Sequence, residues 1–537
     1  MKKIKFLVSV IACGVLLNSC NDYLDINENP NSVHQEDLTP QLIFPGAITQ
    51  TYRTQGTTML EFGNIMMNSW AGNSYAFGGP FTNEYTLSSV NSSFYSGIWD
   101  GIYPNLANFA YIESYPNSDK RQNNYIAAAK IMKAYYMQYL VDLYGDVPYS
   151  EAFQGQKNLT PRYDDDAAIY KSLIEDMDAA KALITAAPAN ALAMGTADIV
   201  FAGNMSNWTN FANTIKFKLL MRMSNVTGDL ATYRNQQLAT LSTASFISAD
   251  VFEKPGYAGT SDAALHPTTL TYFTNSAGNI PQRNLLITAS ENLATALNGN
   301  NLSLPDTYYQ KYNGIVDPRR VRLFLTVGGV VRGVRQGATP GQPGAPNDSN
   351  VVSSLSPYTV GANSTAAGTI ISQSNARGGL LMSLAELNLL KAEAALRYPG
   401  IFPSFDGQSL FNSAITQSGL TMNGNTTAIN MATYIAQIST RPGLGWVGST
   451  EQKYEAIMTQ KWILLTQSNP TEMYIEFNRL GQKYPASPLA TTATRPNKPL
   501  RLIYPTSEYV GNSSNVPNIS SNDVFVKNQY TPFWNQN

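Results

Sequence analysis

The feature that most constrains the fold is a regular spacing of apolar residues at helical intervals. Between residues 125 and 143 these residues follow one another at steps of four and three, which places them on one face of an α-helix. Gly145 and Pro148 come next, and both residue types end helices. We therefore expect a long helix that buries one face, formed by Tyr125, Ala129, Met132, Tyr136, Tyr139 and Leu143.

Helical segments recur along the chain. Helix pairs joined by turns are typical of tetratricopeptide-like units, although the 34-residue signature is too degenerate here for repeats to be counted. No regular alternation of strands and helices indicates a doubly wound sheet. We predict a mainly α fold, a tetratricopeptide-like helical scaffold with long irregular loops and a few short β-hairpins. The further helical segments are residues 169–184, 208–223, 387–394 and 454–465.

Three of these helices have residues before them that can cap a helix. Ser383 with Glu386, and Ser449 with Gln452, have the spacing of a capping box, in which each side chain bonds the other residue's backbone N–H. The run Asp164-Asp165-Asp166 stands before a third helix, where carboxylates cap the chain and complement the positive helix end. Clustered carboxylates also bind hard cations, so a metal site is the alternative. Capping is the favoured interpretation.

Long irregular stretches separate the helices. Residues 71–93, 256–282 and 328–376 are rich in Gly, Pro, Ser, Thr and Asn. Loops of this length in a compact domain are usually functional or disordered. Short hairpins are expected within them, for instance around residues 323–334. We predict a single binding domain over residues 41–537 that carries these three loop-rich insertions.

The first twenty residues predict export and lipid attachment. A lysine-rich start precedes an apolar stretch, residues 6–17, that is too short to span a bilayer as a helix. Leu17-Asn18-Ser19-Cys20 resembles a bacterial lipobox. We expect residues 1–19 to be removed as a signal peptide and Cys20 to be acylated. Plain secretion with a free Cys20 is the alternative.

The polar segment that follows predicts how the body is held. Residues 20–40 are rich in Asn and Pro and read as an extended, lipidated tether. No later segment holds about eighteen uninterrupted apolar residues, the length that a membrane-spanning helix needs. We therefore expect a body that is attached to the membrane only at its start.

Charge and residue counts exclude several function classes. The formal net charge is −1 and only 14% of residues are charged, so there is no basic surface for nucleic acid. The chain has two histidines, His34 and His266, and two cysteines, with none of the usual zinc motifs. No nucleophile elbow accompanies the histidines. We therefore expect no cofactor, no metal and no catalytic residues, and an enzyme that depends on histidine is disfavoured.

One glycine-rich segment formally matches a motif of dinucleotide-binding proteins. Residues 443–448 match GxGxxG, but a dinucleotide site needs a strand before the glycines and an acid about twenty residues later. Arg441-Pro442 precedes the motif, so a turn before a helix is favoured. Glycoside hydrolysis would need two carboxylates facing each other across a cleft, and the sequence identifies no such pair.

Aromatic residues in the loops are the most suggestive feature for binding. Flat rings beside amide groups suit sugar recognition, because a ring packs on the C–H face of a pyranose and amides pair with its hydroxyls. The alternative is that these rings fold back and close the helical core. The candidates are Trp70, Tyr75, Phe77, Phe81, Asn83 and Tyr85 in the first loop, and Tyr272, Phe273, Asn279 and Arg283 in the second.

A series of short blocks extends from one end of the chain to the other. They are residues 21–31 (NDYLDINENPN), 144–152 (YGDVPYSEA), 317–319 (DPR), 331–334 (VRGV), 384–386 (LAE), 391–394 (KAEA), 460–462 (QKW) and 499–508 (PLRLIYPTSE). In this order they resemble the SusD/RagB-like outer-membrane lipoproteins of the Bacteroidetes. The sequence motifs that mark this family mostly have structural roles. The family's ligand-binding residues therefore cannot be assigned to particular positions in this chain.

The resemblance implies a binding protein, not an enzyme, with a tetratricopeptide-like scaffold and an irregular ligand-binding half. It also implies a location at the cell surface, on the outer membrane, above a SusC-like TonB-dependent transporter that imports captured glycans. Peptide or glycopeptide cargo is the alternative within the family. A lipid-anchored glycoside hydrolase and a purely structural scaffold are further alternatives.

Overall fold

The computed structural model describes residues 38–73, 80–299, 307–345, 351–422, 429–466 and 468–536. The signal peptide, Cys20 and all of the tether before residue 38 lie outside the described residues, as do the candidate residues Tyr75 and Phe77. Within the described part, no helix is both long and apolar enough to cross a membrane.

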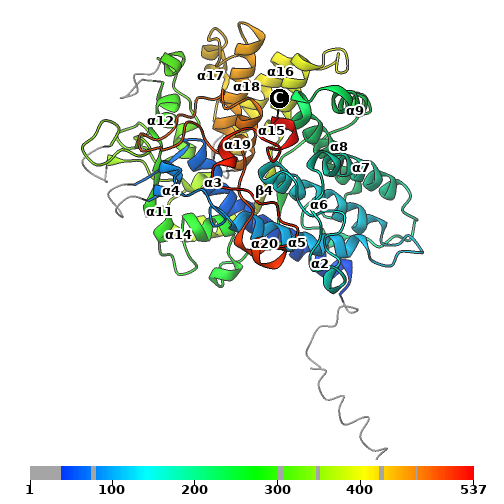
Figure 1. Ribbon diagram of the computed structural model, residues 1–537. Helices are drawn as coiled ribbons and strands as arrows, with labels where there is room; N and C mark the ends of the chain where they lie inside the picture. The colour runs from blue at the N-terminus through cyan, green and yellow to red at the C-terminus, as the bar shows by residue number, and fades with distance from the viewer. Residues whose placement is uncertain are drawn as a thin grey trace, which may run out of the picture.

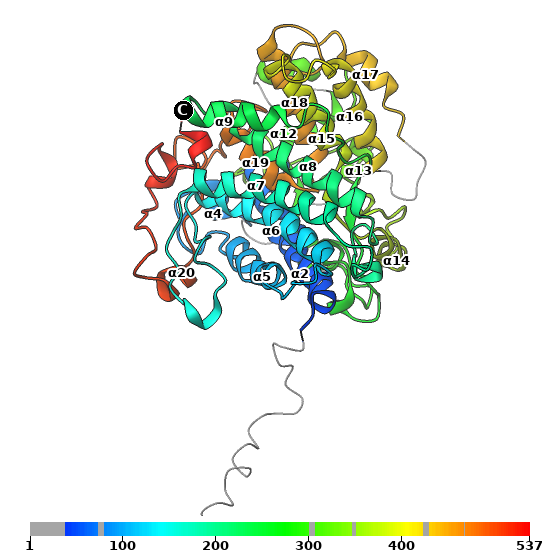
Figure 2. The same ribbon diagram turned by 90° about the vertical axis from the view of Figure 1, so that its right-hand side faces the viewer.

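A stack of antiparallel helices forms the first half of the scaffold, and each of its helices packs against the next along the chain (Figures 1 and 2). These helices are α2 (Pro40–Thr54), α5 (Gly97–Glu113), α6 (Asn123–Tyr144), α7 (Asp166–Thr185) and α8 (Met205–Arg222). The C-terminal half adds α15 (Leu384–Arg397), α16 (Gly407–Thr421), α17 (Ala432–Ile438), α18 (Thr450–Leu465) and α19 (Pro470–Arg479).

The two halves pack against each other. Helix α15 packs against α8, and α19 packs against α3 (Leu60–Met66), which follows α2 through a π-helical turn, Gln55–Met59. Shorter elements lie between or beside the scaffold helices. They are α4 (Thr82–Thr86), α9 (Gly228–Ala239), α10 (Pro267–Tyr272), α11 (Gln282–Leu286), α12 (Glu291–Asn298), α13 (Arg320–Leu323), α14 (Ala367–Arg377) and α20 (Thr506–Gly511).

The predicted helices are confirmed, with one difference in burial. Residues 125–143 lie in α6, which ends at Gly145, a residue with φ of 72°. The apolar spacing predicts one buried face, whereas α6 is buried on almost every side. The reason is its central place, in contact with α2, α5, α7 and α8. The segment predicted to end at residue 223 ends at Arg222, and Met223 begins a 3₁₀ turn.

The two predicted capping boxes have different outcomes. Ser449 and Gln452 form the complete box at the start of α18. Ser383 also caps its helix, because its Oγ accepts from the Glu386 N–H at 3.1 Å. The Glu386 side chain instead accepts from Lys218 Nζ at 2.9 Å, since that buried ammonium needs a carboxylate.

The short strands are present, but they pair across long stretches of chain rather than as hairpins. β1 (Trp70–Gly72) is antiparallel to β3 (Ile287–Ala289), and β2 (Val251–Glu253) is antiparallel to β4 (Gly379–Met382). Around residues 323–334, where a hairpin was expected, the structure has isolated bridges: Val327 with Val330 inside the segment, Phe324 with Leu355, and Val334 with Ser290. Each ladder instead pairs two segments that are more than 100 residues apart in the chain.

Charged side chains are buried where the two halves meet. Arg222 of α8 pairs with Asp142 of α6 and with Glu472 and Glu476 of α19. Arg479 of α19 pairs with Glu393 of α15 and with Glu476. Burial raises the pKa of Asp142 to about 6, against the lowering effect of Arg222. These ion pairs lie inside the scaffold and fix the relative positions of its helices.

Candidate functional site

The β1–β3 ladder brings the two predicted aromatic loops together. Trp70 lies opposite Ala289, and Gly72 lies opposite Ile287. Residues 272–283 come just before β3 in the chain, so the ladder places them beside the loop that follows β1. In Figure 1 the elements of this region, α4 and α11, lie on the side of the molecule opposite α7 and α8.

Trp70 and Tyr272 meet inside this region. Their ring centroids are 5.3 Å apart in an edge-to-face arrangement, and their exposed fractions are 1% and 2%. The Tyr272 hydroxyl donates to the Thr57 carbonyl oxygen at 3.0 Å. Both rings therefore close the core in this structure, as the alternative interpretation expected. Phe273 is also buried.

Phe81 and Arg283 form a second contact between the two loops. The Arg283 guanidinium lies 5.2 Å from the Phe81 ring centroid, at a cation–π distance. Its Nε donates to Glu61 Oε2 at 2.5 Å. Because α3 buries Glu61, this ion pair orients Arg283 over the ring. Arg283 therefore connects the two loops to α3, and Glu61 balances its charge.

Tyr85 is the predicted aromatic residue that reaches a cavity. Its hydroxyl oxygen accepts from the Gly72 N–H at 2.6 Å, which fixes the ring against the end of β1. Burial raises the pKa of Tyr85 well above its usual value, so the phenol keeps its proton as a further donor. A Cβ at residue 72 would lie 2.6 Å from Pro80 Cγ, so this close approach requires glycine.

The cavity beside Tyr85, here called the loop hollow, has a volume of about 360 Å³. This falls in the range of small-molecule sites. The sequence did not predict seven of its twelve wall residues, which come from the late segment 334–340 and Thr492 and reach the site only through tertiary packing. The signal available was compositional, since residues 334–340 lie within the Gly- and Pro-rich insertion. The walls are Gly72, Pro80, Thr82, Tyr85 and Thr86 on one side, and Val334, Arg335, Gly337, Ala338, Thr339, Pro340 and Thr492 on the other.

The loop hollow is chemically neutral. Threonine hydroxyls and a phenol lie among alanine, valine and proline side chains. Its one charged wall residue, Arg335, donates from Nε to Glu291 Oε2 at 2.9 Å, which balances the charge. Such walls can pack on C–H groups and bond hydroxyls, and they offer no full charge to an ionic ligand.

The two candidate asparagines lie on the surface. Asn83 is exposed on α4, next to the loop hollow, although it is not one of its wall residues. Asn279 is exposed in a turn, where its N–H donates to Asn275 Oδ1 at 2.8 Å. Of the described candidates, Tyr85 alone lines the hollow, and the Phe81 ring lies 6.4 Å from the Tyr85 ring between centroids.

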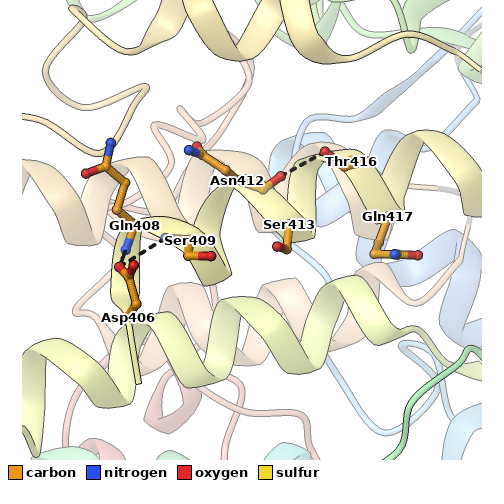
Figure 3. Close-up of a pocket in the computed structure, with 7 residues that line it drawn as sticks. All are labelled: Asp406, Gln408, Ser409, Asn412, Ser413, Thr416 and Gln417. Carbon is orange, nitrogen blue, oxygen red and sulfur yellow. Dashed lines mark hydrogen bonds between the residues drawn. The ribbon is translucent and has the colours of Figure 1, made fainter. Parts of the chain in front are cut away.

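A second hollow follows the exposed face of α16 (Figure 3). Its volume is about 480 Å³, and every wall residue comes from this helix or its cap. Asp406 caps the helix by accepting from the N–H groups of Gln408 and Ser409. Thr416 Oγ1 donates to the Asn412 carbonyl oxygen at 3.1 Å. This surface is polar but has no aromatic ring, so it is less suited to a sugar face than the loop hollow.

The three aspartates near the start of α7 act as caps and turn residues. Asp165 accepts from the Ala168 N–H at 2.8 Å and is the N-cap of α7. Asp164 Oδ2 accepts from the Tyr149 and Ser150 N–H groups. Oxygens of Asp146, Asp165 and Asp166 lie within 4.8 Å of one another. Because these carboxylates accept from backbone N–H groups, the geometry agrees with the capping interpretation.

The described histidine is structural. His266 is buried between the rings of Tyr52 and Tyr257, at centroid distances of 5.8 and 5.2 Å. Burial lowers the pKa of His266 to about 3, so the imidazole stays neutral. The GxGxxG segment forms a turn at the start of α18, and a turn rather than a strand precedes it. The nucleotide-site interpretation is therefore unsupported.

Comparison with known proteins gives one consistent result. The model of the SusD-like family described as "Starch-binding associating with outer membrane" matches residues 30–505. No curated protein matches the chain.

Several solved structures share the fold. A chitin-binding protein is 23% identical, with 89% of this chain and 95% of that chain covered and a TM-score of 0.63. A chitin-binding SusD homolog from Flavobacterium johnsoniae is 20% identical over 92% and 98% of the two chains, with a TM-score of 0.65. A SusD homolog from Bacteroides uniformis is 18% identical over 88% and 95%, with a TM-score of 0.65.

Proposed function

The chain belongs to the SusD-like family of starch-binding proteins that associate with the outer membrane, and from this membership we propose that it binds oligosaccharides and delivers them to a SusC-like TonB-dependent transporter. Membership in a family of binding proteins agrees with the expectation that the chain is not an enzyme. The lipid anchor at Cys20 and an orientation toward the cell exterior are parts of the proposal.

The loop hollow is the observation on which the binding site rests. It combines a phenol, threonine hydroxyls and apolar side chains, with Arg335 already paired to Glu291. An uncharged sugar presents hydroxyls and C–H faces, which match these groups. Two of the solved structures with this fold are described as chitin-binding, which supports a glycan as the cargo. Affinity in the micromolar to millimolar range corresponds to about −8 to −4 kcal/mol.

The direct test is titration of the purified protein with malto-oligosaccharides, chito-oligosaccharides and a mixed peptide library. Thr82→Trp should fill the loop hollow and weaken glycan binding by at least about tenfold. Thr416→Trp is the matched control, because Thr416 is also an exposed helical threonine beside a hollow, the one along α16. We expect it to keep wild-type affinity.

Other outcomes would redirect the proposal. Binding of peptides without any glycan would assign peptide cargo. Loss of glycan binding in Thr416→Trp, with Thr82→Trp unaffected, would move the site to α16. For the location, Cys20→Ala should release the protein from membranes, and continued membrane association would contradict the lipid anchor.

A further inference from the structure

A third cavity lies near the C-terminus, between the end of α19 and two late segments of the chain. This C-terminal pocket has a volume of about 490 Å³ and shares no wall residue with the loop hollow. Its walls come from residues 477–482, 487–500 and 525–535. The last of these includes the turn Phe533–Asn535, which contacts α19 (Figure 1).

The charge of this pocket differs from that of the loop hollow. Its described wall residues include two lysines, Lys498 and Lys527, and no carboxylate. Apolar groups complete the walls, among them the rings of Phe477 and Phe525 and the side chain of Leu500. The pocket therefore combines positive charge with ring and aliphatic surfaces.

Lys498 is buried without a counter-charge among the described residues. Its Nζ donates to three neutral oxygens: the Met66 carbonyl, Asn68 Oδ1 at 2.7 Å and Ser487 Oγ. No described carboxylate forms an ion pair with it within 4.0 Å, and its exposed fraction is 4%. Burial lowers the pKa of Lys498 well below its usual value. A buried ammonium is costly unless an opposite charge balances it, so a carboxylate bound nearby would favour the charged form of Lys498.

Asn535 adds an unused donor to the same walls. The residue is 3% exposed, and its Nδ2 has no hydrogen-bond partner among the described residues. The residue is held in place because its backbone N–H donates to the Pro532 carbonyl oxygen at 2.8 Å, while the Phe533 N–H donates to Asp166 Oδ2 at 2.8 Å. Leaving a buried donor unpaired costs free energy, so a ligand acceptor at this position would be stabilising.

We propose that the C-terminal pocket binds the carboxylate of a small acidic ligand, with Lys498 supplying the counter-charge and Asn535 Nδ2 a hydrogen bond. The Phe477 and Phe525 rings would pack against the body of the ligand. An acidic sugar has both a carboxylate and a body with C–H faces that can pack on these rings. The preference for a carboxylate is inferred from the pocket alone. The inference that the rest of the ligand is a sugar rests on the proposed function.

The test titrates the full chain with glucuronate, with its neutral counterpart glucose, and with acetate. We expect glucuronate to bind at least about tenfold more tightly than glucose. Asn535→Asp replaces the amide donor by a carboxylate of the same shape and should weaken glucuronate binding by at least about tenfold. Asn190→Asp is the matched control, an identical change at an exposed site outside the pocket and the loop hollow, and should bind like wild type. Lys498→Met should abolish the preference for glucuronate over glucose, with circular dichroism as the check of folding.

Several results would overturn the proposal. These are equal binding of glucose and glucuronate, no binding of glucuronate, or an unchanged affinity in Asn535→Asp. Since Asn535→Asp keeps the size of the side chain, it decides the question even if Lys498→Met fails to fold. Tighter binding of acetate than of glucuronate would support a carboxylate site but contradict the inference that the ligand is a sugar. If the protein binds neutral oligosaccharides but not glucuronate, the proposed function stands and only the carboxylate site is rejected. If it binds glucuronate but no neutral oligosaccharide, the carboxylate site stands and the proposed function is rejected.

Discussion

Lys218 of α8 donates from its Nζ to Glu386 Oε1 of α15 at 2.9 Å, and both side chains are at most 2% exposed. The same ammonium is 2.9 Å from Glu472 Oε2 of α19. One cation thus balances two buried carboxylates from helices that are far apart in the sequence. The contact joins the N-terminal helix stack to the C-terminal helices.

Removing this ammonium should strongly destabilise the scaffold. Lys218→Met keeps the length of the side chain but leaves Glu386 and Glu472 short of a buried counter-charge. We expect a loss of about 3–5 kcal/mol in the free energy of unfolding, measured by urea denaturation. Lys483→Met is the control, because the Lys483–Glu451 pair is more than half exposed and should contribute little to stability. Equal effects of the two substitutions would contradict the structural role of Lys218.

Glu253 predicts a specific dependence of stability on pH. Burial raises the pKa of Glu253 to about 8, although its Oε1 accepts from the Tyr257 hydroxyl at 2.8 Å and the Gly379 N–H at 3.0 Å. Between the ordinary glutamate pKa and about 8, the folded protein holds a proton that the unfolded chain releases. Stability should therefore fall as pH rises through this interval, and level off above it.

Glu253→Gln should remove this dependence, because the amide mimics the protonated acid. We expect little difference from wild type at pH 5, and an advantage for the variant at pH 8 of up to roughly 4 kcal/mol in the free energy of unfolding. Urea denaturation at several pH values measures it. The half-exposed Glu451 provides the control substitution, Glu451→Gln. Parallel profiles for Glu253→Gln and wild type would show that Glu253 is ionised in the folded protein.

Gly63 allows α3 to approach α19 closely. A Cβ at residue 63 would lie 2.2 Å from the Pro470 carbonyl carbon and the Thr471 nitrogen, both backbone atoms that cannot move aside. Gly63→Ala should therefore push the helices apart and cost about 1–3 kcal/mol of stability. Gly46→Ala is the matched control within α2, because a Cβ there meets nothing within 4 Å. It should be neutral or stabilising by up to about 1 kcal/mol, since alanine favours helix. A harmless Gly63→Ala would contradict the close packing.

The scaffold could be predicted from local patterns, because helical periodicity and caps depend on residues a few positions apart. The apolar spacing of residues 125–143 located α6, and Ser449 with Gln452 located the start of α18. The same reasoning could not predict that α6 is buried almost all round, because this depends on which helices surround it. Nor could it predict that the Glu386 side chain pairs with Lys218 rather than completing its cap.

The site could be predicted only in part. Composition identified the loops, and the structure brings the first loop to residues 334–340 at the loop hollow. Which rings face a ligand depends on the pairing of residues 70–72 with residues 287–289, more than 200 positions away. Local sequence holds no information on that register. In the sequence, Trp70 and Tyr272 could therefore not be distinguished from Tyr85, although both are buried and neither lines the loop hollow.

Trp70 separates the two interpretations of the aromatic loops experimentally. Its ring is 1% exposed, contacts Tyr272 and does not line the loop hollow. Trp70→Ala should therefore create a cavity in the core and cost about 3–5 kcal/mol of stability, measured by urea denaturation. Trp446→Ala is the control at a half-buried ring, and it should cost less. Glycan affinity, corrected for the folded fraction, should stay at the wild-type value in Trp70→Ala. Full stability combined with lost glycan binding would instead identify Trp70 as a sugar-binding platform that becomes accessible when ligand is present.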